Sequence, residues 1–364
     1  NTNIGIDAAF LNNRIDVSME YYNTKTKDVI WNKALPVING AFSPDGGPKA
    51  NYTTNLNMCE TSNKGFELAL NTRNIITKNF TWSSSVTFNH NKEKITKLSG
   101  GDSDVLNNGD TGYALALGEA INSYYHYKLD GVWQKGEETD AAVFGAAPGD
   151  LKINIPNLVK ESDGRFYKID EETGSAAVDE NGNVIYYTSD NKYTPSDADY
   201  QILGHNSPDW SLGFQNNFTW KDFDLSVFVY ARYGQMFAYD MLTSYDPKGI
   251  RNFPTYFNYW TENNPSNDFP AANANKGLEQ YTGYYALRYV DGSFIKIKNI
   301  TLGYSLPKSI LKSAGIEKCR FYATITNPFV FAKSHLLKDY DPEMNGSLKY
   351  PLTKQFVFGV NVTF

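Results

Sequence analysis

Several stretches of the sequence alternate apolar and polar residues with a period of two, and this pattern constrains the fold most. Near the C-terminus one face collects the apolar side chains of Phe356, Phe358, Val360, Val362 and Phe364. The other face collects Gln355, Gly359, Asn361 and Thr363, with Val357 as the exception. Because successive side chains of a β-strand point to opposite faces, this pattern predicts a strand with one apolar and one polar face.

The same alternation recurs along the chain and predicts an all-β fold. We expect roughly nine strands, over residues 3–11, 14–23, 64–72, 79–90, 208–220, 222–233, 290–305, 319–331 and 353–364. The alternation changes phase between Ile297 and Ile300, which predicts a β-bulge near Asn299. Helical patterns are nearly absent, and the best candidate is a segment of one or two turns within 307–318.

The connections between these strands fall into two kinds. Short turns are expected at Asn12-Asn13, at Lys221-Asp222 and around 72–79. Long polar stretches are expected over 24–63, 92–207, 234–288 and 333–352. Long structureless loops are unusual in a compact soluble domain. Tight periplasmic turns opposite long extracellular loops are typical of an outer-membrane β-barrel, whose strands span with about 9–11 residues.

Aromatic residues support a membrane barrel. Several lie near the predicted short turns or at the chain end, and nearly all lie on the apolar face of their strand: Phe10, Phe80, Trp220, Phe223, Tyr304, Phe321 and Phe364. Aromatic side chains gather at the membrane–water interface, so this set is predicted to form an aromatic girdle in contact with outer-membrane lipid. The alternative is a soluble β-sandwich, which does not explain the asymmetry of the connections.

The number of strands suggests that the barrel is larger than this chain. The first and the last predicted strands both run toward the short-turn side, so the set is odd. Bacterial single-chain barrels have an even number of strands and no open edge. We therefore expect residues 1–364 to be the C-terminal part of a larger barrel. An additional span over 119–135 is the alternative, which the long connections on both sides of it disfavour.

The composition excludes several classes of protein. Lys plus Arg number 34 and Asp plus Glu 40, which gives a net charge of −6 and argues against a nucleic-acid binder. Cys59 and Cys319 lie too far apart in sequence for a disulfide framework or a paired-cysteine metal motif. The chain has no apolar run of about 18 residues, and its first residues do not resemble a signal peptide.

No catalytic constellation stands out in the sequence. The four histidines are not paired at metal-ligand spacing, and the glycine-rich segments match neither a phosphate-binding loop nor a dinucleotide-binding fingerprint. Enzyme activity and a bound cofactor are therefore not expected.

Several segments together resemble the SusC/RagA family of TonB-dependent outer-membrane transporters. They are KGFELALNTRNI with FTWSSSVTFNHNKEKITKL (64–98), LGHNSPDWSLGFQNNFTWKDFDLSVFVYARYG (203–234), YWTENNPSNDFP (259–270), VDGSFIKIKNITLGYSLPK (290–308), NPFVF (327–331), DYDPE (339–343) and the terminal FVFGVNVTF. The resemblance implies a barrel of about 22 strands in the bacterial outer membrane, of which this chain supplies roughly the last nine. It also implies an N-terminal plug, a SusD-like lipoprotein lid, and energy from TonB for the import of oligosaccharides or peptides.

Candidate binding residues follow from the same resemblance and from general chemistry. Aromatic faces beside polar groups suit carbohydrate, which makes five loop residues candidates for substrate contact: Tyr124, Tyr125, Trp133, Tyr256 and Trp260. The alternative for each of them is packing between loops or against the lid. The family also implies an acidic loop, for which Asp179, Asn181 and Asn183 are weak calcium candidates, although a hairpin turning at Asn181-Gly182 is favoured.

Three functions remain open at this point. The first is active import as the barrel of a SusC-like transporter. The second is a soluble extracellular all-β protein that binds glycans or mediates adhesion. The third is a passive porin, which keeps the barrel and lacks the plug.

Overall fold

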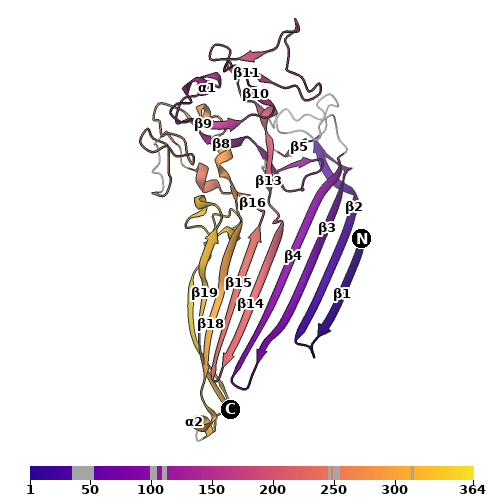
Figure 1. Cartoon of the computed structure of the whole chain (residues 1–364), viewed down its shortest axis with the longest axis vertical. Coiled ribbons are helices and arrows are strands. Elements are labelled where there is room, and N and C mark those ends of the chain that lie inside the picture. The colour runs from indigo at the N-terminus through magenta and orange to yellow at the C-terminus, as the bar shows by residue number, and fades with distance from the viewer. Residues whose placement is uncertain (35–52, 99–104, 109–112, 245–246, 249–254, 313–314) are drawn as a thin grey trace.

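Nine antiparallel strands form one large sheet in the computed structural model, which describes residues 1–34, 53–98, 105–108, 113–244, 247–248, 255–312 and 315–364. We call this sheet the wall. Its strands, in spatial order, are β1 (Thr2–Phe10), β2 (Ile15–Ala34), β3 (Thr53–Ile76), β4 (Phe80–Leu98), β14 (Trp210–Trp220), β15 (Phe223–Tyr233), β18 (Phe294–Ser305), β19 (Lys318–Ala332) and β20 (Gln355–Thr363). The strands lie side by side along the long axis of the molecule (Figure 1). The nine predicted strands are therefore confirmed.

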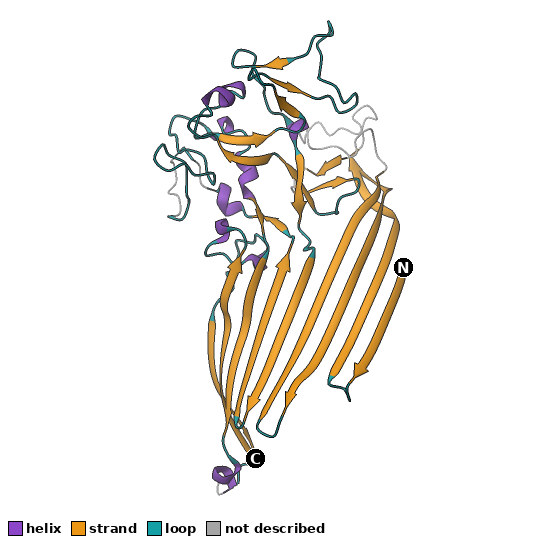
Figure 2. Cartoon of the chain, in the orientation of Figure 1, coloured by secondary structure: helices purple, strands orange, loops and turns teal. Residues whose placement is uncertain are grey.

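The remaining elements gather at one end of the wall, and we call them the loop body (Figure 2). It contains a four-stranded sheet of β5 (Val105–Asn108), β6 (Tyr113–Ala116), β7 (Ser123–His126) and β13 (Gln201–His205). Three smaller sheets pair β8 (Lys128–Val132) with β9 (Leu151–Asn154), β16 (Met236–Ala238) with β17 (Tyr289–Asp291), and join β10 (Leu158–Lys160), β11 (Phe166–Lys168) and β12 (Tyr186–Tyr187).

Short helices complete the structure. Those of the loop body are α1 (Glu138–Val143), η3 (Asp197–Asp199), η4 (Asp240–Thr243), η5 (Leu278–Gln280), η6 (Tyr284–Arg288), η8 (His335–Leu337) and η9 (Pro342–Met344). At the opposite end, α2 (Lys308–Leu311) lies within the predicted helical segment 307–318 (Figure 1). None of the helices that the structure describes is long and apolar enough to cross a membrane.

The two ends of the wall differ as predicted. Leu11, Asn12 and Asn13 have positive φ angles and join β1 to β2, and Lys221, also with positive φ, lies in the two-residue turn between β14 and β15. The long connections that the structure describes lie at the loop-body end (Figure 2). Segment 119–135 does not span the wall, because it forms β7 and β8 within the loop body.

Two of the predicted long connections, 24–63 and 92–207, differ from the structure. β2, β3 and β4 extend well past 14–23, 64–72 and 79–90, so much of the predicted loop 24–63 is strand, with 35–52 outside the described residues. The extensions contain segments that are polar on both faces, as in TKTKD and NKEKITK, and these segments carry no apolar alternation. The stretch 92–207 is also not structureless, because its short strands pair with one another.

The predicted bulge near Asn299 is confirmed. On β15, Phe228 pairs with Asn299 and the next residue, Val229, pairs with Ile297, so Lys298 is the extra residue. The bulge keeps the apolar face continuous, since Ile297 and Ile300 both meet apolar partners on β15.

The predicted aromatic girdle forms a row across the wall. The strand registers place Phe80 opposite Trp220, Trp220 opposite Phe223, Phe223 opposite Tyr304, and Tyr304 opposite Phe321. Phe10 ends β1 at its turn, and Phe364 follows the end of β20. Trp220, Phe223 and Phe321 are exposed. All seven therefore lie near the short-turn end, and their contact with a membrane interface stays a prediction.

One polar cluster interrupts the apolar face of the wall. Asn216 and Ser84 lie opposite each other on β14 and β4. The Oδ1 atom of Asn216 accepts hydrogen bonds from Trp82 Nε1 at 2.9 Å and Ser84 Oγ at 2.8 Å, and Ser84 Oγ accepts one from Asn74 Nδ2 at 2.8 Å. Polar groups on this face thus bond to one another, which lowers the cost of placing them in hydrocarbon.

Candidate functional site in the loop body

The loop body contains the largest apolar core of the described residues. This core is built from residues that lie far apart in sequence: Val132, Leu151, Phe237, Tyr239, Leu242, Phe257, Trp260, Phe269, Tyr281, Tyr284, Leu287, Val290 and Leu337. Phe257 stacks on Phe269 with ring centroids 4.2 Å apart. The described parts of the connections over 92–352 therefore form a packed body that can hold side chains in fixed positions above the wall.

A group of aromatic rings lies where the four-stranded sheet meets β17. We call it the tyrosine cluster, and it comprises Tyr113, Tyr124, Tyr125, His126, Tyr127, Tyr200 and Tyr289. Tyr124 is buried at its centre, 4.8 Å from Tyr113 and 4.9 Å from Tyr289 between ring centroids. His126 stacks on Tyr200 at 4.8 Å. Tyr113, Tyr125, His126, Tyr200 and Tyr289 each keep part of their surface exposed.

β-sheet pairing creates this cluster. β7 carries Tyr124, Tyr125 and His126 in succession, and it pairs on one side with β6 and on the other with β13. Gln201, directly after Tyr200, lies opposite His126 in that register. The ring of Tyr200 is thereby brought against β7 from a segment far along the chain.

Burial favours the neutral forms of three side chains in the tyrosine cluster. Burial, assisted by the nearby Arg288 guanidinium, lowers the pKa of His126 to about 4. Burial and the hydrogen bond with Tyr113 raise the pKa of Tyr124, and burial and Asp197 raise that of Tyr200. The rings and hydroxyl groups of these three side chains therefore favour their neutral forms, whereas two charged groups border the cluster: Arg288, whose Nη2 atom donates to the Tyr289 hydroxyl at 3.2 Å, and Asp197 beside Tyr200.

Three of the five residues predicted to contact substrate are instead packed within the loop body. Packing between loops was the alternative for each of them. Trp133 is buried and stacks on Phe144 at 5.6 Å, with Lys152 Nζ 4.4 Å from its ring. Trp260 is buried and donates from Nε1 to Gln134 Oε1 at 2.9 Å. Tyr124 is also buried, so none of the three offers an open ring face.

The other two predicted residues, Tyr125 and Tyr256, are partly exposed. Tyr125 belongs to the tyrosine cluster, whereas Tyr256 packs edge-on against Phe257. Substrate contact stays a prediction for both. His126, Tyr200 and Tyr289 were missed, although the run YYHY at 124–127 was a visible signal of an aromatic centre.

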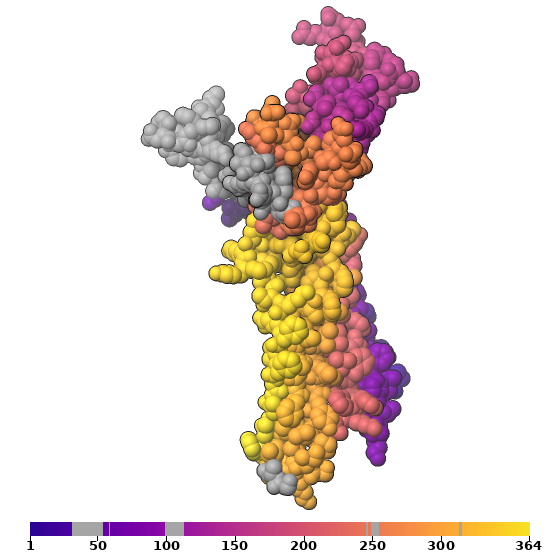
Figure 3. All heavy atoms as spheres, turned by 90° about the vertical axis from the view of Figure 1, so that its left-hand side faces the viewer, coloured from indigo at the N-terminus to yellow at the C-terminus, as the bar shows by residue number. Residues whose placement is uncertain are grey.

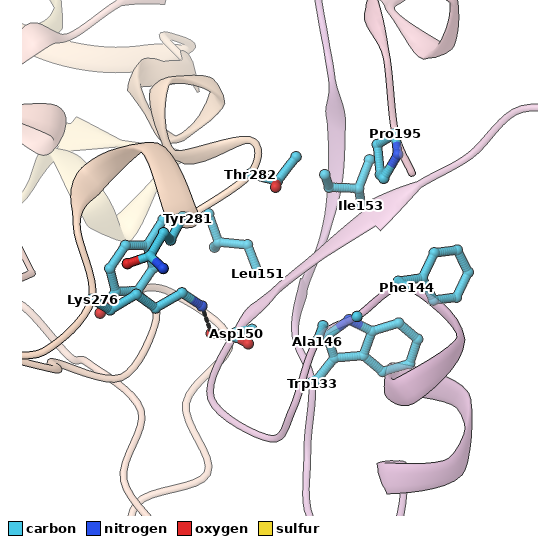
Figure 4. A pocket seen from close by; sticks show the side chains of 12 residues that line it. Trp133, Phe144, Ala146, Asp150, Leu151, Ile153, Pro195, Lys276, Tyr281 and Thr282 are labelled. Carbon is cyan, nitrogen blue, oxygen red and sulfur yellow. Dashed lines mark hydrogen bonds and ion pairs between the residues drawn. The ribbon is translucent and has the colours of Figure 1, made fainter. Parts of the chain in front are cut away.

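A small hollow lies beside Trp133, between β9 and η5 (Figure 4). Its volume of about 60 Å³ is far below the roughly 300–1,000 Å³ of small-molecule sites. Lys276 Nζ and Asp150 Oδ1, 2.5 Å apart, form an ion pair at its edge. This hollow is therefore a packing gap and not a substrate site.

A buried ion cluster fastens the segment 333–354 to the wall. Lys296 has no exposed side-chain surface, and its Nζ atom lies 2.5 Å from Asp341 Oδ2 and 2.8 Å from Glu343 Oε2. Lys298, the bulge residue, approaches Glu343 Oε1 at 2.6 Å. Burial alone would raise the pKa of Glu343, but these two lysines hold that pKa below its usual value. The motif DYDPE therefore supplies both carboxylates of a latch, formed by Lys296, Lys298, Asp341 and Glu343.

The weak calcium candidates form the predicted hairpin. Gly182 has a positive φ, and its N–H donates to Asp179 O at 3.0 Å. The Asp179 carboxylate accepts from the backbone N–H groups of Asn181 and Asn183, both at 2.9 Å. Among the described residues, no three His, Cys, Asp or Glu side chains are grouped to hold a metal ion. Calcium at Asp179, Asn181 and Asn183 stays a prediction.

Comparisons with known proteins agree with this architecture. A scan against protein-family models found no match. A TonB-dependent receptor of Formosa agariphila is 28% identical over 99% of the chain, and the TonB-dependent receptor SusC of Bacteroides thetaiotaomicron is 27% identical over 100%. The chain spans about one third of the length of these curated relatives, 33% and 31% respectively. These proteins are receptors and not enzymes.

Among solved structures, the RagAB peptide transporter matches 100% of the chain with a TM-score of 0.70 and 24% identity, and the chain covers 35% of it. The RagAB peptide importer in its closed-closed state gives a TM-score of 0.69. The wall and these matches define the class of protein: the chain is part of a β-barrel of the bacterial outer membrane. Within that class, the resemblance to the SusC/RagA family of TonB-dependent transporters is confirmed.

Proposed function

We propose that the chain forms the C-terminal part of the barrel of a SusC-like transporter that actively imports nutrients across the outer membrane. The observation that carries this proposal is the similarity to TonB-dependent receptors along the whole chain, combined with a nine-stranded wall topped by one loop body. The edge strands β1 and β20 each have one neighbour in this sheet, and closed barrels have no free edges. Further strands and the plug would come from the rest of the transporter.

The two faces of the wall support a water-filled lumen. The polar face carries an ion pair between Asp224 and Arg320, and Thr301 Oγ1 bonds to Thr324 Oγ1 at 2.9 Å. The opposite face carries large exposed apolar side chains, including Ile4, Phe356 and Phe358. In the proposed transporter the polar face lines the import route and the apolar face contacts lipid.

The tyrosine cluster favours an oligosaccharide as the substrate class. Its part-exposed rings and hydroxyl groups match the apolar faces and hydroxyl edges of sugar rings, and burial keeps its His126 ring neutral near pH 7. A peptide is the second candidate, which the fold similarity to the RagAB peptide transporter favours. The loop body also offers exposed Tyr285 and Tyr259, and we propose that a SusD-like lipoprotein lid rests on this side.

Uptake measurements in cells test the proposal. Cells carrying the whole transporter are given fluorescent oligosaccharides or fluorescent peptides, with TonB present or inactivated. Active import predicts uptake of one class that stops without TonB, whereas a passive porin predicts uptake that continues. A chain that stays monodisperse in water without detergent would instead support the soluble adhesive alternative and end the transporter proposal.

Paired substitutions then test the site. Tyr125→Ala with Tyr200→Ala removes two part-exposed rings of the tyrosine cluster and is expected to reduce uptake at low substrate concentration by about tenfold or more. Tyr167→Ala with Tyr187→Ala, which removes two part-exposed rings of β11 and β12 outside the cluster, is the matched control and is expected to leave uptake unchanged. Equal uptake by both variants would show that the substrate binds elsewhere.

A further inference from the structure

A second hollow, distinct from the tyrosine cluster, lies between the upper part of β19 and the returning segment 333–354. Its volume is about 870 Å³, within the range of ligand sites. It forms because β20 accompanies β19 only up to the pair Thr326 and Gln355, above which the chain diverges from the strand. Figure 3 views this side of the molecule, where a C-terminal segment projects from the wall below the loop body.

The lining of this hollow combines apolar side chains with lysines. Leu348, Leu352 and Phe331 contribute exposed apolar surface, and the neighbouring Tyr350 is 97% exposed. Lys338, Lys349 and Lys354 also line it and are exposed. Such a combination of exposed apolar and cationic groups matches an amphiphile with an anionic head.

The charged side chains that the structure describes around the hollow do not form ion pairs with these three lysines, so the lysines can bind an anionic group. Asp341 is held by Lys296, and His335 bonds to Asp268 at 2.9 Å, so both are already engaged. Lys333 lies nearby and pairs with Asp291. Asp339 is the other carboxylate of the lining. Among the described residues, no carboxylate lies within ion-pair distance of Lys338, Lys349 or Lys354.

The hollow lies at the height of the outer membrane surface. Phe321, in the aromatic row near the short turns, and Phe331, at the hollow, are both exposed on the apolar face of β19. They are about ten residues apart, which corresponds to about 34 Å along a strand and about 26 Å of height at a tilt of about 40°. The apolar band of an outer-membrane barrel is about 25 Å tall, so the lysines lie level with lipid headgroups.

We propose that this hollow binds a phosphate-bearing lipid of the outer leaflet. The acyl chains would lie along Phe329 and Phe331 on the apolar face of β19, and the phosphate would lie among the three lysines. The proposal rests on the placement of the wall in the membrane and does not depend on what is imported. The other candidate occupant is a barrel strand paired with β20, and the experiment separates the two.

Native mass spectrometry of the whole purified transporter provides the test. The probe is an acylated glucosamine disaccharide with two phosphates, compared with the same lipid after phosphate removal and with inorganic phosphate. The triple variant K338Q/K349Q/K354Q is expected to weaken binding of the phosphorylated lipid by between about fivefold and a hundredfold, since each lysine near a membrane surface contributes about fivefold. Dephosphorylated lipid is expected to bind wild type and variant equally, and inorganic phosphate to neither.

The matched control is K128Q/K192Q/K312Q, which removes three exposed lysines elsewhere on the chain and is expected to bind the phosphorylated lipid like the wild type. Heat-modifiable migration confirms that each variant barrel is folded. Equal lipid binding by the two triple variants, or equal binding of the phosphorylated and dephosphorylated lipids by the wild type, would overturn the proposal in favour of a strand in the hollow. TonB-dependent uptake, measured in parallel, reports separately on the import function.

Discussion

The wall exposes large apolar side chains on its surface, whereas the loop body buries the same types of residue in a core. In the wall, Phe358 is 81% exposed and Ile4 is 62% exposed, whereas in the loop body Phe237 and Leu242 have no exposed surface. In the proposed barrel the wall stabilises its strands by backbone pairing and contact with lipid, so its apolar side chains point outward. The loop body stands in water and must enclose its apolar side chains. One chain is therefore built for two solvents.

The latch joins these two regions, and its removal is expected to have the largest effect. Lys296→Met leaves the largely enclosed Asp341 carboxylate without a cation and leaves Glu343 with Lys298 alone, which should cost about 3–5 kcal/mol. The free energy of unfolding in lipid vesicles and protease cleavage within 333–354 on intact cells measure the effect. Lys298→Met, at a position that is partly exposed, should cost less.

A compensated variant sharpens that test. Lys296→Met combined with Asp341→Asn and Glu343→Gln removes three of the four charges and should regain much of the lost stability, because the remaining charge, on Lys298, is partly exposed to water. If the compensated variant is no more stable than Lys296→Met alone, the latch does not act through its charges.

Truncating one phenylalanine in each region tests the comparison directly. Phe237→Ala opens a cavity in the loop-body core and should cost about 3–5 kcal/mol. Phe358→Ala on the lipid-facing side should cost below about 1 kcal/mol. Thermal unfolding and limited proteolysis of the folded barrel measure both. Similar losses for the two variants would contradict the assignment of two solvents.

A charge placed on either face of β15 tests which side meets lipid. Val227 lies on the apolar face opposite Ile300, and Ser226 lies on the polar face opposite Thr301. Val227→Arg should cost about 2–4 kcal/mol in a bilayer, whereas Ser226→Arg should cost little because it points into water. Urea unfolding in vesicles gives the two values, and the reverse order would mean that the faces are exchanged.

The smallest expected effect is a pH dependence confined to the loop body. The pKa of His126 is lowered to about 4 in the folded chain, mainly by burial, against 6.5 for an unperturbed histidine. Between these values the unfolded chain binds the extra proton, so the stability from neutral His126 is complete above pH 6.5 and is lost as the pH falls toward 4. Unfolding at pH 7.5 and pH 5 should differ less in His126→Phe than in the wild type.

The wall could be predicted from the sequence far better than the loop body. Alternation over 208–233 and 290–305 identified strands, turns and even the bulge, because lipid on one face and water on the other impose a period of two. The loop body lacks that constraint, and its short strands depend on contacts between distant segments. Trp133 and Trp260 were predicted to face substrate because a sequence does not distinguish a buried ring from an open one.

The tyrosine cluster and the latch show the same limit. Tyr125 was predicted, but Tyr200 reaches the cluster through the pairing of β13 with β7, and Tyr289 reaches it by packing against Tyr124. No local pattern reveals either contact. DYDPE was recognised as a motif, yet its partner Lys296 lies on another strand. The sequence thus indicated which segments carry aromatic and charged side chains for the cluster and the latch. It did not show which of these side chains contact one another.

Because Lys298 is an extra residue in β18, the number of residues in this strand decides which face of the wall each upper side chain occupies. Deleting that one residue would rotate everything from Phe294 to Ile297 by half a turn relative to the lower strand. Lys296 would then face hydrocarbon and Ile297 would face the aqueous channel. Homologous barrels should therefore tolerate many exchanges of side chain here, yet rarely a change in the number of residues between these points.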